Sequence, residues 1–221
     1  MTSGATSGMT NPMASGKRDT LTSGMVDALI ARLWPHGDHP DGPQVHAVVD
    51  AARDPRLIGL LDATGLERCC LFAGPLSPAL RAAAPHLVHL APNVRFTRDW
   101  LQHGWGHSWG VLTIAPPDVT LQQLRQHLRT LLRVRDESGR TLLFRLYDPR
   151  VLRTYLPTCT ATETQRVFGP VHRFVCEPDQ ESGTADASGA LVFDRDAPQR
   201  PHHGKAVHIE YGPLLPQAVP C

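Results

Sequence analysis

Short runs rich in β-forming residues alternate with segments of helical periodicity along most of the chain, from Val45 to Cys176. This alternation is typical of a sheet whose faces are covered by helices. The runs that favour strands are 45–52, 69–72, 86–90, 109–114, 141–147 and 171–176, followed by two short ones at 191–193 and 206–211. We therefore predict an α/β fold, a mixed β-sheet flanked by helices, in a single domain.

The clearest helix is predicted to begin at Thr120 and to end at Arg133. Its leucines recur at helical spacing and share one face, and Thr120 with Gln123 forms a capping-box pattern at the start. Arg125, Arg129 and Arg133 are four residues apart and share another face. Such a row of arginines could bind an acidic partner or a phosphate, but it is more often a solvated face that nearby acidic residues offset.

The chain is predicted to comprise four parts. Residues 1–25 are mainly Thr, Ser, Gly and Met, which favours a flexible leader, and residues 26–176 make up the α/β domain. Residues 177–190 are acidic, small and polar, which is typical of a linker or a long exposed loop. Residues 191–221 form a proline-rich C-terminal extension with short β-like runs.

Charge balance and cysteine usage exclude several classes of protein. Lys and Arg number 22 against 21 for Asp and Glu, and this formal net charge of +1 argues against a dedicated nucleic-acid binder. No apolar run is long enough to span a membrane, and the N-terminus lacks the apolar core of a secretory signal. Five cysteines, an odd number without a C-x-x-C pair, indicate a reducing cytoplasm.

The sequence favours neither a metal site nor a cofactor. His103 and His107 are four residues apart but have glycines between them, and His86 and His89 would point to opposite faces of a strand. There is no Walker loop and no G-x-G-x-x-G motif for a nucleotide. We therefore expect no metal ion and no cofactor.

The segment Gly106-His107-Ser108-Trp109-Gly110 matches the letters of the G-x-S-x-G nucleophile elbow. In that elbow a strand precedes the serine and a helix follows, whereas here a helical turn precedes and a strand follows. Asp148 and His172 could serve as triad partners in hydrolase order. The alternative is a glycine loop that leads into a core strand, with Trp105 and Trp109 as packing residues.

The most specific stretch is 142–152, where an apolar strand runs directly into an Asp-Pro helix start. Strand alternation predicts that the side chains at 142, 144 and 146 face the core and that Arg145 and Tyr147 face outward. Asp148 would then cap the helix and could accept a bidentate bond from Arg145 or Arg150. The result is a stiff strand-to-helix corner.

Two roles are open for this corner. Arginine and tyrosine are enriched at the hot spots of protein interfaces. The predicted protein-binding residues are Arg145, Tyr147, Asp148 and Arg150. The alternative is a corner that only holds the fold together.

Four features occur in the order found in a known family. They are Asp50-Ala51-Ala52 after a β-rich start, Cys70–Gly74 followed by Ala84–Val88, Trp109-Gly110 leading to His127-Leu128-Arg129, and Phe144–Leu152 with Phe168-Gly169-Pro170 downstream. With these features, the chain from Val45 to Cys176 resembles the adaptor, or effector-chaperone, family of bacterial type VI secretion systems. The run F-R-x-Y-D-P-R-V-L is the specific part of the resemblance.

The resemblance implies a cytoplasmic non-enzyme that binds a toxic effector and loads it onto the valine-glycine-repeat spike protein. The expected partners are the spike and a cognate effector, without nucleic acid or membrane insertion. Longer family members continue into a C-terminal helical lobe, whereas the chain after Pro170 has no leucine-periodic helix. Two other hypotheses are a serine hydrolase built on Ser108 and a regulatory module that holds a small ligand at the sheet edge.

Overall fold

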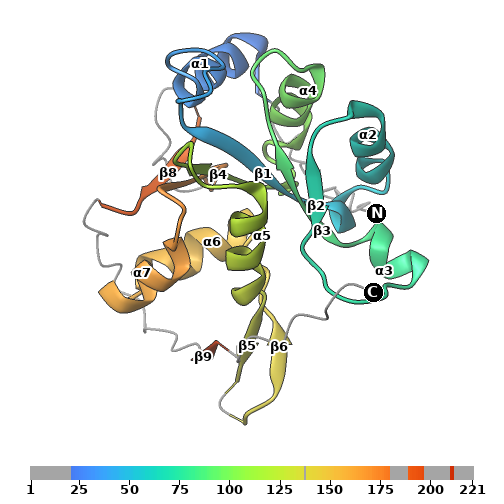
Figure 1. Cartoon of the computed structure of the whole chain (residues 1–221), viewed down its shortest axis with the longest axis vertical. Coiled ribbons are helices and arrows are strands. Elements are labelled where there is room, and N and C mark those ends of the chain that lie inside the picture. The colour runs from blue at the N-terminus through green and yellow to red at the C-terminus, as the bar shows by residue number, and fades with distance from the viewer. Residues whose placement is uncertain (1–20, 137, 180–188, 197–209, 212–221) are drawn as a thin grey trace, which may run out of the picture.

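The computed structural model describes residues 21–136, 138–179, 189–196 and 210–211 of the 221-residue chain (Figure 1). The helices are α1 (Ser23–Leu33), α2 (Leu57–Thr64), α3 (Pro78–Ala82), α4 (Arg95–Gly104), α5 (Leu121–Thr130), α6 (Pro149–Tyr155) and α7 (Ala161–Phe168). The strands are β1 (Gln44–Asp50), β2 (Arg68–Cys70), β3 (Pro85–His89), β4 (Gly110–Ala115), β5 (Arg133–Arg135), β6 (Thr141–Leu143), β7 (Arg173–Cys176), β8 (Leu191–Asp194) and β9 (Glu210–Tyr211). Residues 1–20 of the predicted leader, most of the predicted linker and most of the C-terminal extension lie outside the described residues.

Six strands form the central sheet, in the order β2-β3-β1-β4-β7-β8. The predicted α/β domain with a sheet flanked by helices is confirmed, but each described strand pair is antiparallel rather than mixed. The helices α2 and α4 do connect parallel strands, β1 to β2 and β3 to β4. However, β3 lies between β1 and β2, and β1 lies between β3 and β4. The parallel strands are therefore not neighbours in the sheet.

Helices cover both faces of the central sheet (Figure 1). Helices α1, α2 and α4 share one apolar cluster with Val45, Ala47 and Val49 of β1. Helices α5, α6 and α7 share the other with Val48, whose side chain points the opposite way because strand residues alternate. The central strand is therefore buried on both faces, which explains its nearly continuous apolar sequence.

The folded domain begins before the predicted boundary at residue 25. Leu21 is buried, and Thr22 caps α1 by accepting a hydrogen bond from the backbone N–H of Met25. Val26, one turn into the helix, lies in the core. The assignment of residues 21–25 to the leader is therefore wrong, because packing on the sheet stabilises a helix start whose Ser and Gly content argues against it.

The domain also continues beyond the predicted end at residue 176. Strand β8 pairs with β7 and forms an edge of the central sheet, and Glu177, placed in the predicted exposed loop, is buried. The first three residues of β8 are apolar and favour a strand, as predicted for 191–193. Their sequence carries no information about which sheet they join, because pairing is set by distant partners.

The strand predicted at 141–147 is shorter than expected and does not belong to the central sheet. It is reduced to β6, which pairs with β5 in a hairpin that extends away from the central sheet (Figure 1). Leu142 and Leu143 are 46% and 53% exposed, so the predicted burial of Leu142 is wrong. The alternation failed because β6 belongs to a small three-stranded sheet, β6-β5-β9, and not to the central one.

Candidate functional site

The strand-to-helix corner forms as the sequence predicts at its helical end. Asp148 has an extended backbone, and its side chain accepts a hydrogen bond of 3.0 Å from the N–H of Arg150. Pro149 occupies the first turn of α6, where its missing N–H leaves no acceptor unpaired. The Asp-Pro start of α6 is therefore confirmed.

Two buried carboxylates and three arginines form a continuous ion-pair network at this corner, which we call the Asp50–Asp148 network. Arg145 forms a salt bridge with Asp50, which lies at the end of β1 and is fully buried. Arg53 bridges the two acids, because its Nη2 is 2.7 Å from Asp148 Oδ2 and its Nε is 3.5 Å from Asp50 Oδ2. Arg150 donates to both carboxylate oxygens of Asp148, at 3.0 and 2.7 Å.

The network joins two segments that are 95 residues apart in the sequence. Of the two arginines considered for the bidentate bond to Asp148, the structure selects Arg150, while Arg145 turns to Asp50. Sequence reasoning missed Asp50 and Arg53 as members of the site. The one available signal was Asp50-Ala51-Ala52, a charged residue directly after a buried strand.

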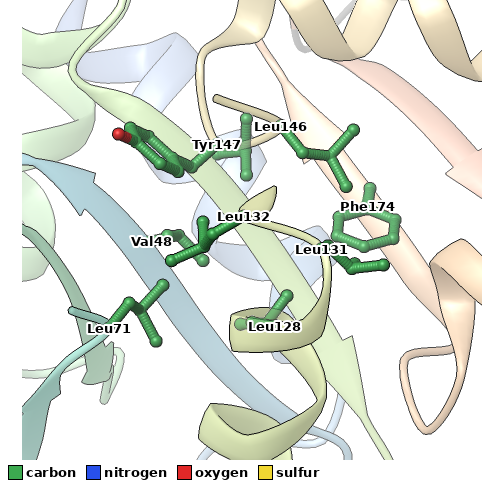
Figure 2. Close-up of a pocket in the computed structure, with 9 residues that line it drawn as sticks. Val48, Leu71, Leu128, Leu131, Leu132, Leu146, Tyr147 and Phe174 are labelled. Carbon is green, nitrogen blue, oxygen red and sulfur yellow. The ribbon is translucent and has the colours of Figure 1, made fainter. Parts of the chain in front are cut away.

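Tyr147 is buried, contrary to the prediction that it faces outward. It is 5% exposed and lies among apolar side chains that line a small cavity (Figure 2). A turn with a 2.8 Å hydrogen bond from the N–H of Asp148 to the carbonyl of Arg145 interrupts the strand, so Leu146 and Tyr147 both point inward. The guanidinium of Arg145 lies 5.7 Å from the ring centroid, a cation–π distance.

Burial dominates the electrostatics of the corner. Burial raises the pKa of the Asp148 carboxyl, while Arg53 and Arg145 act in the opposite direction. Burial also raises the pKa of Tyr147 to about 12, and the charge of Asp50 adds to the effect. The outer members, Arg145 and Arg150, keep 36% and 57% of their side chains exposed. Their positions are thus fixed from inside while part of each side chain remains exposed.

The family described as "Domain of unknown function (DUF4123)" matches residues 45–166, more than half of the chain. The chain belongs to this family. No curated protein and no solved structure matches the chain. The DUF4123 match begins within β1 and ends within α7, so it contains both halves of the Asp50–Asp148 network. Strands β7 and β8, which complete the central sheet, lie after it.

The G-x-S-x-G segment of the DUF4123 domain lies between α4 and β4, in the element order that the sequence predicts. Ser108 is buried, adopts a positive φ of 56°, and donates its hydroxyl to Glu177 Oε1 at 3.1 Å. Glu177 Oε2 also accepts from the N–H groups of Gly106 and Ser108. The hydrogen bonds found for the Ser108 hydroxyl therefore reach neither Asp148 nor His172, the two proposed triad partners.

Two hollows in the described part of the chain differ in the size of the ligand that they could hold. The cavity in Figure 2 lies between the central sheet and α5, is lined by apolar side chains and has a volume of about 10 Å³, too small for a metabolite. A cleft of about 330 Å³ lies between α1 and strands β4, β7 and β8. It is lined mostly by aliphatic side chains, with Arg32, Arg173 and Asp194 as its charged members. Its size falls at the lower end of the range for small-molecule sites.

Within the described ranges, no group of three or more His, Cys, Asp or Glu side chains is arranged to hold a metal ion. The four cysteines that the structure describes, Cys69, Cys70, Cys159 and Cys176, are free thiols. In that same part of the chain, none of the helices combines the length and the apolar character needed to cross a bilayer.

Proposed function

We propose that this chain is a non-enzymatic, cytoplasmic adaptor of a bacterial type VI secretion system. It binds a toxic effector and loads it onto the valine-glycine-repeat spike protein. Membership of the DUF4123 family supports the proposal, together with the order of the sequence features that carry the resemblance.

The observation that carries the proposal is the Asp50–Asp148 network. Asp50 and Asp148 are each engaged by two guanidinium groups, an arrangement that holds side chains in place. Arg145 and Arg150, at the two ends of the network, retain exposed surface. Pre-positioned arginines lose little conformational entropy on binding and are favoured at protein interfaces. We therefore assign binding of a partner protein to the outer faces of these two arginines.

The test is co-purification of the tagged full-length chain with its spike and effector, comparing Arg150→Ala with Arg56→Ala. Arg56 is a matched control because it also follows an Asp-Pro pair and also binds both oxygens of that aspartate. It is the N-cap residue of α2 and is not a member of the Asp50–Asp148 network. We expect recovery of one partner to fall about tenfold for Arg150→Ala and to stay unchanged for Arg56→Ala.

The melting temperature separates binding from folding in this test. Arg150 is largely exposed, so we expect Arg150→Ala to keep the wild-type melting temperature within a few degrees. A large drop in melting temperature with normal recovery of both partners would show that the corner is structural only.

The cleft beside α1 favours a second candidate, a module that binds a small ligand at the sheet edge. Strand β8, which lines this cleft, is an edge strand, as that hypothesis requires. A thermal-shift screen of metabolites would support it if a compound raises the melting temperature and Arg173→Gln abolishes the shift.

A serine hydrolase remains the enzymatic alternative. Covalent labelling of Ser108 by a fluorophosphonate probe, abolished in Ser108→Ala, would support it. We expect no labelling, because the Ser108 hydroxyl is buried and donates to a carboxylate.

A further inference from the structure

Three arginines lie close together at the junction of α5 and the hairpin, a group that we call the arginine ridge. Arg125 and Arg129 lie one turn apart on α5, and Arg133 follows as the first residue of β5. The helix ends at Thr130, earlier than predicted. Arg133 nevertheless lies close enough to Arg129 for its charge to lower the pKa of Arg129. Arg135 is not counted in the ridge, because its charge is not among those that act on Arg129.

The ridge carries positive charge that no acidic group neutralises among the residues the structure describes. None of its three arginines forms a salt bridge there. The nearby Asp136 is engaged by Arg140, at 2.8 Å. Burial lowers the pKa of Arg129, and the like charges of Arg125 and Arg133 lower it further. These three guanidinium groups therefore repel one another, and an anionic partner would relieve the repulsion.

One exposed leucine, Leu143 of β6, lies beside the ridge and is 53% exposed. Its neighbour Leu142 is the register partner of Val134 and therefore belongs to the opposite face of the hairpin. Leu143 is the register partner of Arg133, so their side chains share one face of the hairpin. The face carrying Arg133 is the outer one, because the intervening Val134 is buried in the core. Apolar and cationic side chains are thus adjacent on a hairpin that extends from the domain (Figure 1).

We propose that the arginine ridge and Leu143 form a docking surface for an acidic, amphipathic segment of a partner polypeptide. The inference rests on the proposed role as a protein-binding adaptor and names the chemistry of what binds. Charge complementarity selects carboxylates for the ridge, and Leu143 selects a partner with an apolar side chain beside those carboxylates. A nucleic acid fits less well, because phosphates leave Leu143 without a partner and the whole chain carries a net charge of only +1.

The experiment measures binding of a labelled model peptide to the full-length chain by fluorescence anisotropy. The probe is a peptide of about 16 residues in which Glu and Leu recur at helical spacing. Comparison probes are the same residues in scrambled order, a peptide with Lys in place of Glu, and a single-stranded oligonucleotide. The variant is Arg129→Gln with Arg133→Gln; Arg125 is kept because its Nε donates to the backbone carbonyl of Cys70 at 2.9 Å.

The matched control is Arg95→Gln with Arg98→Gln, which removes the same charge from α4. We expect the ridge variant to weaken binding of the Glu-Leu peptide about tenfold and the α4 variant to leave it nearly unchanged. The melting temperature of the ridge variant should equal or exceed that of the wild type, because mutual repulsion is reduced. Binding should also weaken as salt is added.

Three results would overturn the inference. They are equal losses in the two variants, equal binding of the Glu-Leu and Lys-Leu peptides, or tighter binding of the oligonucleotide than of the Glu-Leu peptide. Co-purification separates this inference from the proposed function. Recovery of both spike and effector with the ridge variant at wild-type level refutes the docking surface alone, whereas failure of the wild type to recover either spike or effector refutes the adaptor role.

Discussion

The same tripeptide, Asp-Pro-Arg, occurs at 54–56 and at 148–150 and behaves differently in each place. In both copies the arginine binds the two oxygens of the aspartate. At 54–56 the bond from Arg56 lowers the pKa of Asp54, whereas burial raises the pKa of Asp148. The tripeptide therefore determines the local hydrogen bonds, whereas the burial of the aspartate determines the direction in which its pKa shifts.

Asp50 offers the sharpest test of the network at the residue scale. Asp50→Asn keeps the shape of the side chain and an oxygen for the N–H of Ala52, but it leaves Arg145 and Arg53 without that carboxylate. We expect the free energy of unfolding in urea to fall by about 3 kcal/mol, because removing one partner of a buried ion pair is costly.

Asp54→Asn is the control for that substitution. Its partner Arg56 is mostly exposed, so we expect a loss of less than about 1 kcal/mol. Equal losses for the two variants would mean that burial of Asp50 adds nothing to the strength of its ion pairs.

The candidate site was predictable only where its signals are local. Asp148 as a helix cap follows from the Asp-Pro start, and Arg150 was one of the two arginines predicted as its bidentate partner. Asp50 and Arg53 could not be assigned, because nothing in their neighbourhood shows that a partner 95 residues away will cover them. Tyr147 was misplaced because strand alternation was extended through a turn.

At the scale of elements, β4 depends on a glycine at its first residue. Gly110 has a φ of +150°, and a Cβ placed there would lie 2.0 Å from the backbone carbonyl oxygen of Val48 in β1. Gly110→Ala must therefore push apart the two central strands. We expect a loss of at least about 3 kcal/mol in urea unfolding.

Gly139→Ala separates this steric effect from the cost of the dihedral angle. Gly139 also has a positive φ, of 79°, but nothing lies within 4 Å of a Cβ placed there. We expect a loss of about 1 kcal/mol, the cost of a left-handed backbone alone. Similar losses at both positions would contradict the close contact between β1 and β4.

Elements with a strong local pattern were predictable, and their pairing was not. Leu121, Leu124 and Leu128 lie buried on α5, and the capping box between Thr120 and Gln123 forms as predicted. The strand at 141–147 has an equally clear pattern but joins a hairpin outside the central sheet. Helical burial is fixed by neighbours within a turn, whereas strand burial depends on a partner that the local sequence does not name.

At the scale of the whole molecule, buried histidines make stability depend on pH. Burial and the nearby His89 lower the pKa of His46 to about 3, and burial also lowers the pKa of His86 and of His127. Below the ordinary histidine pKa of 6.5, the unfolded chain binds protons that the folded chain does not. Stability is therefore complete above that value and is lost as pH falls toward 3.

His46 alone should reduce the free energy of unfolding by about 2 kcal/mol between pH 7 and about pH 5. Urea unfolding at several pH values measures the slope, and His46→Gln should flatten it while lowering stability at neutral pH. A wild-type slope of zero over this range would show that His46 is protonated in the folded state.

The Asp50–Asp148 network has a consequence for how the protein is made. During translation, Asp50 and Arg53 are synthesised first. Arg145 follows Asp50, and Asp148 follows Arg53, each 95 residues later in the chain. Until then Asp50 has only Arg53 as a counterion, and Arg53 lacks Asp148, so the network that joins the two segments cannot form. Completion of the fold is thereby postponed until most of the polypeptide has left the exit tunnel.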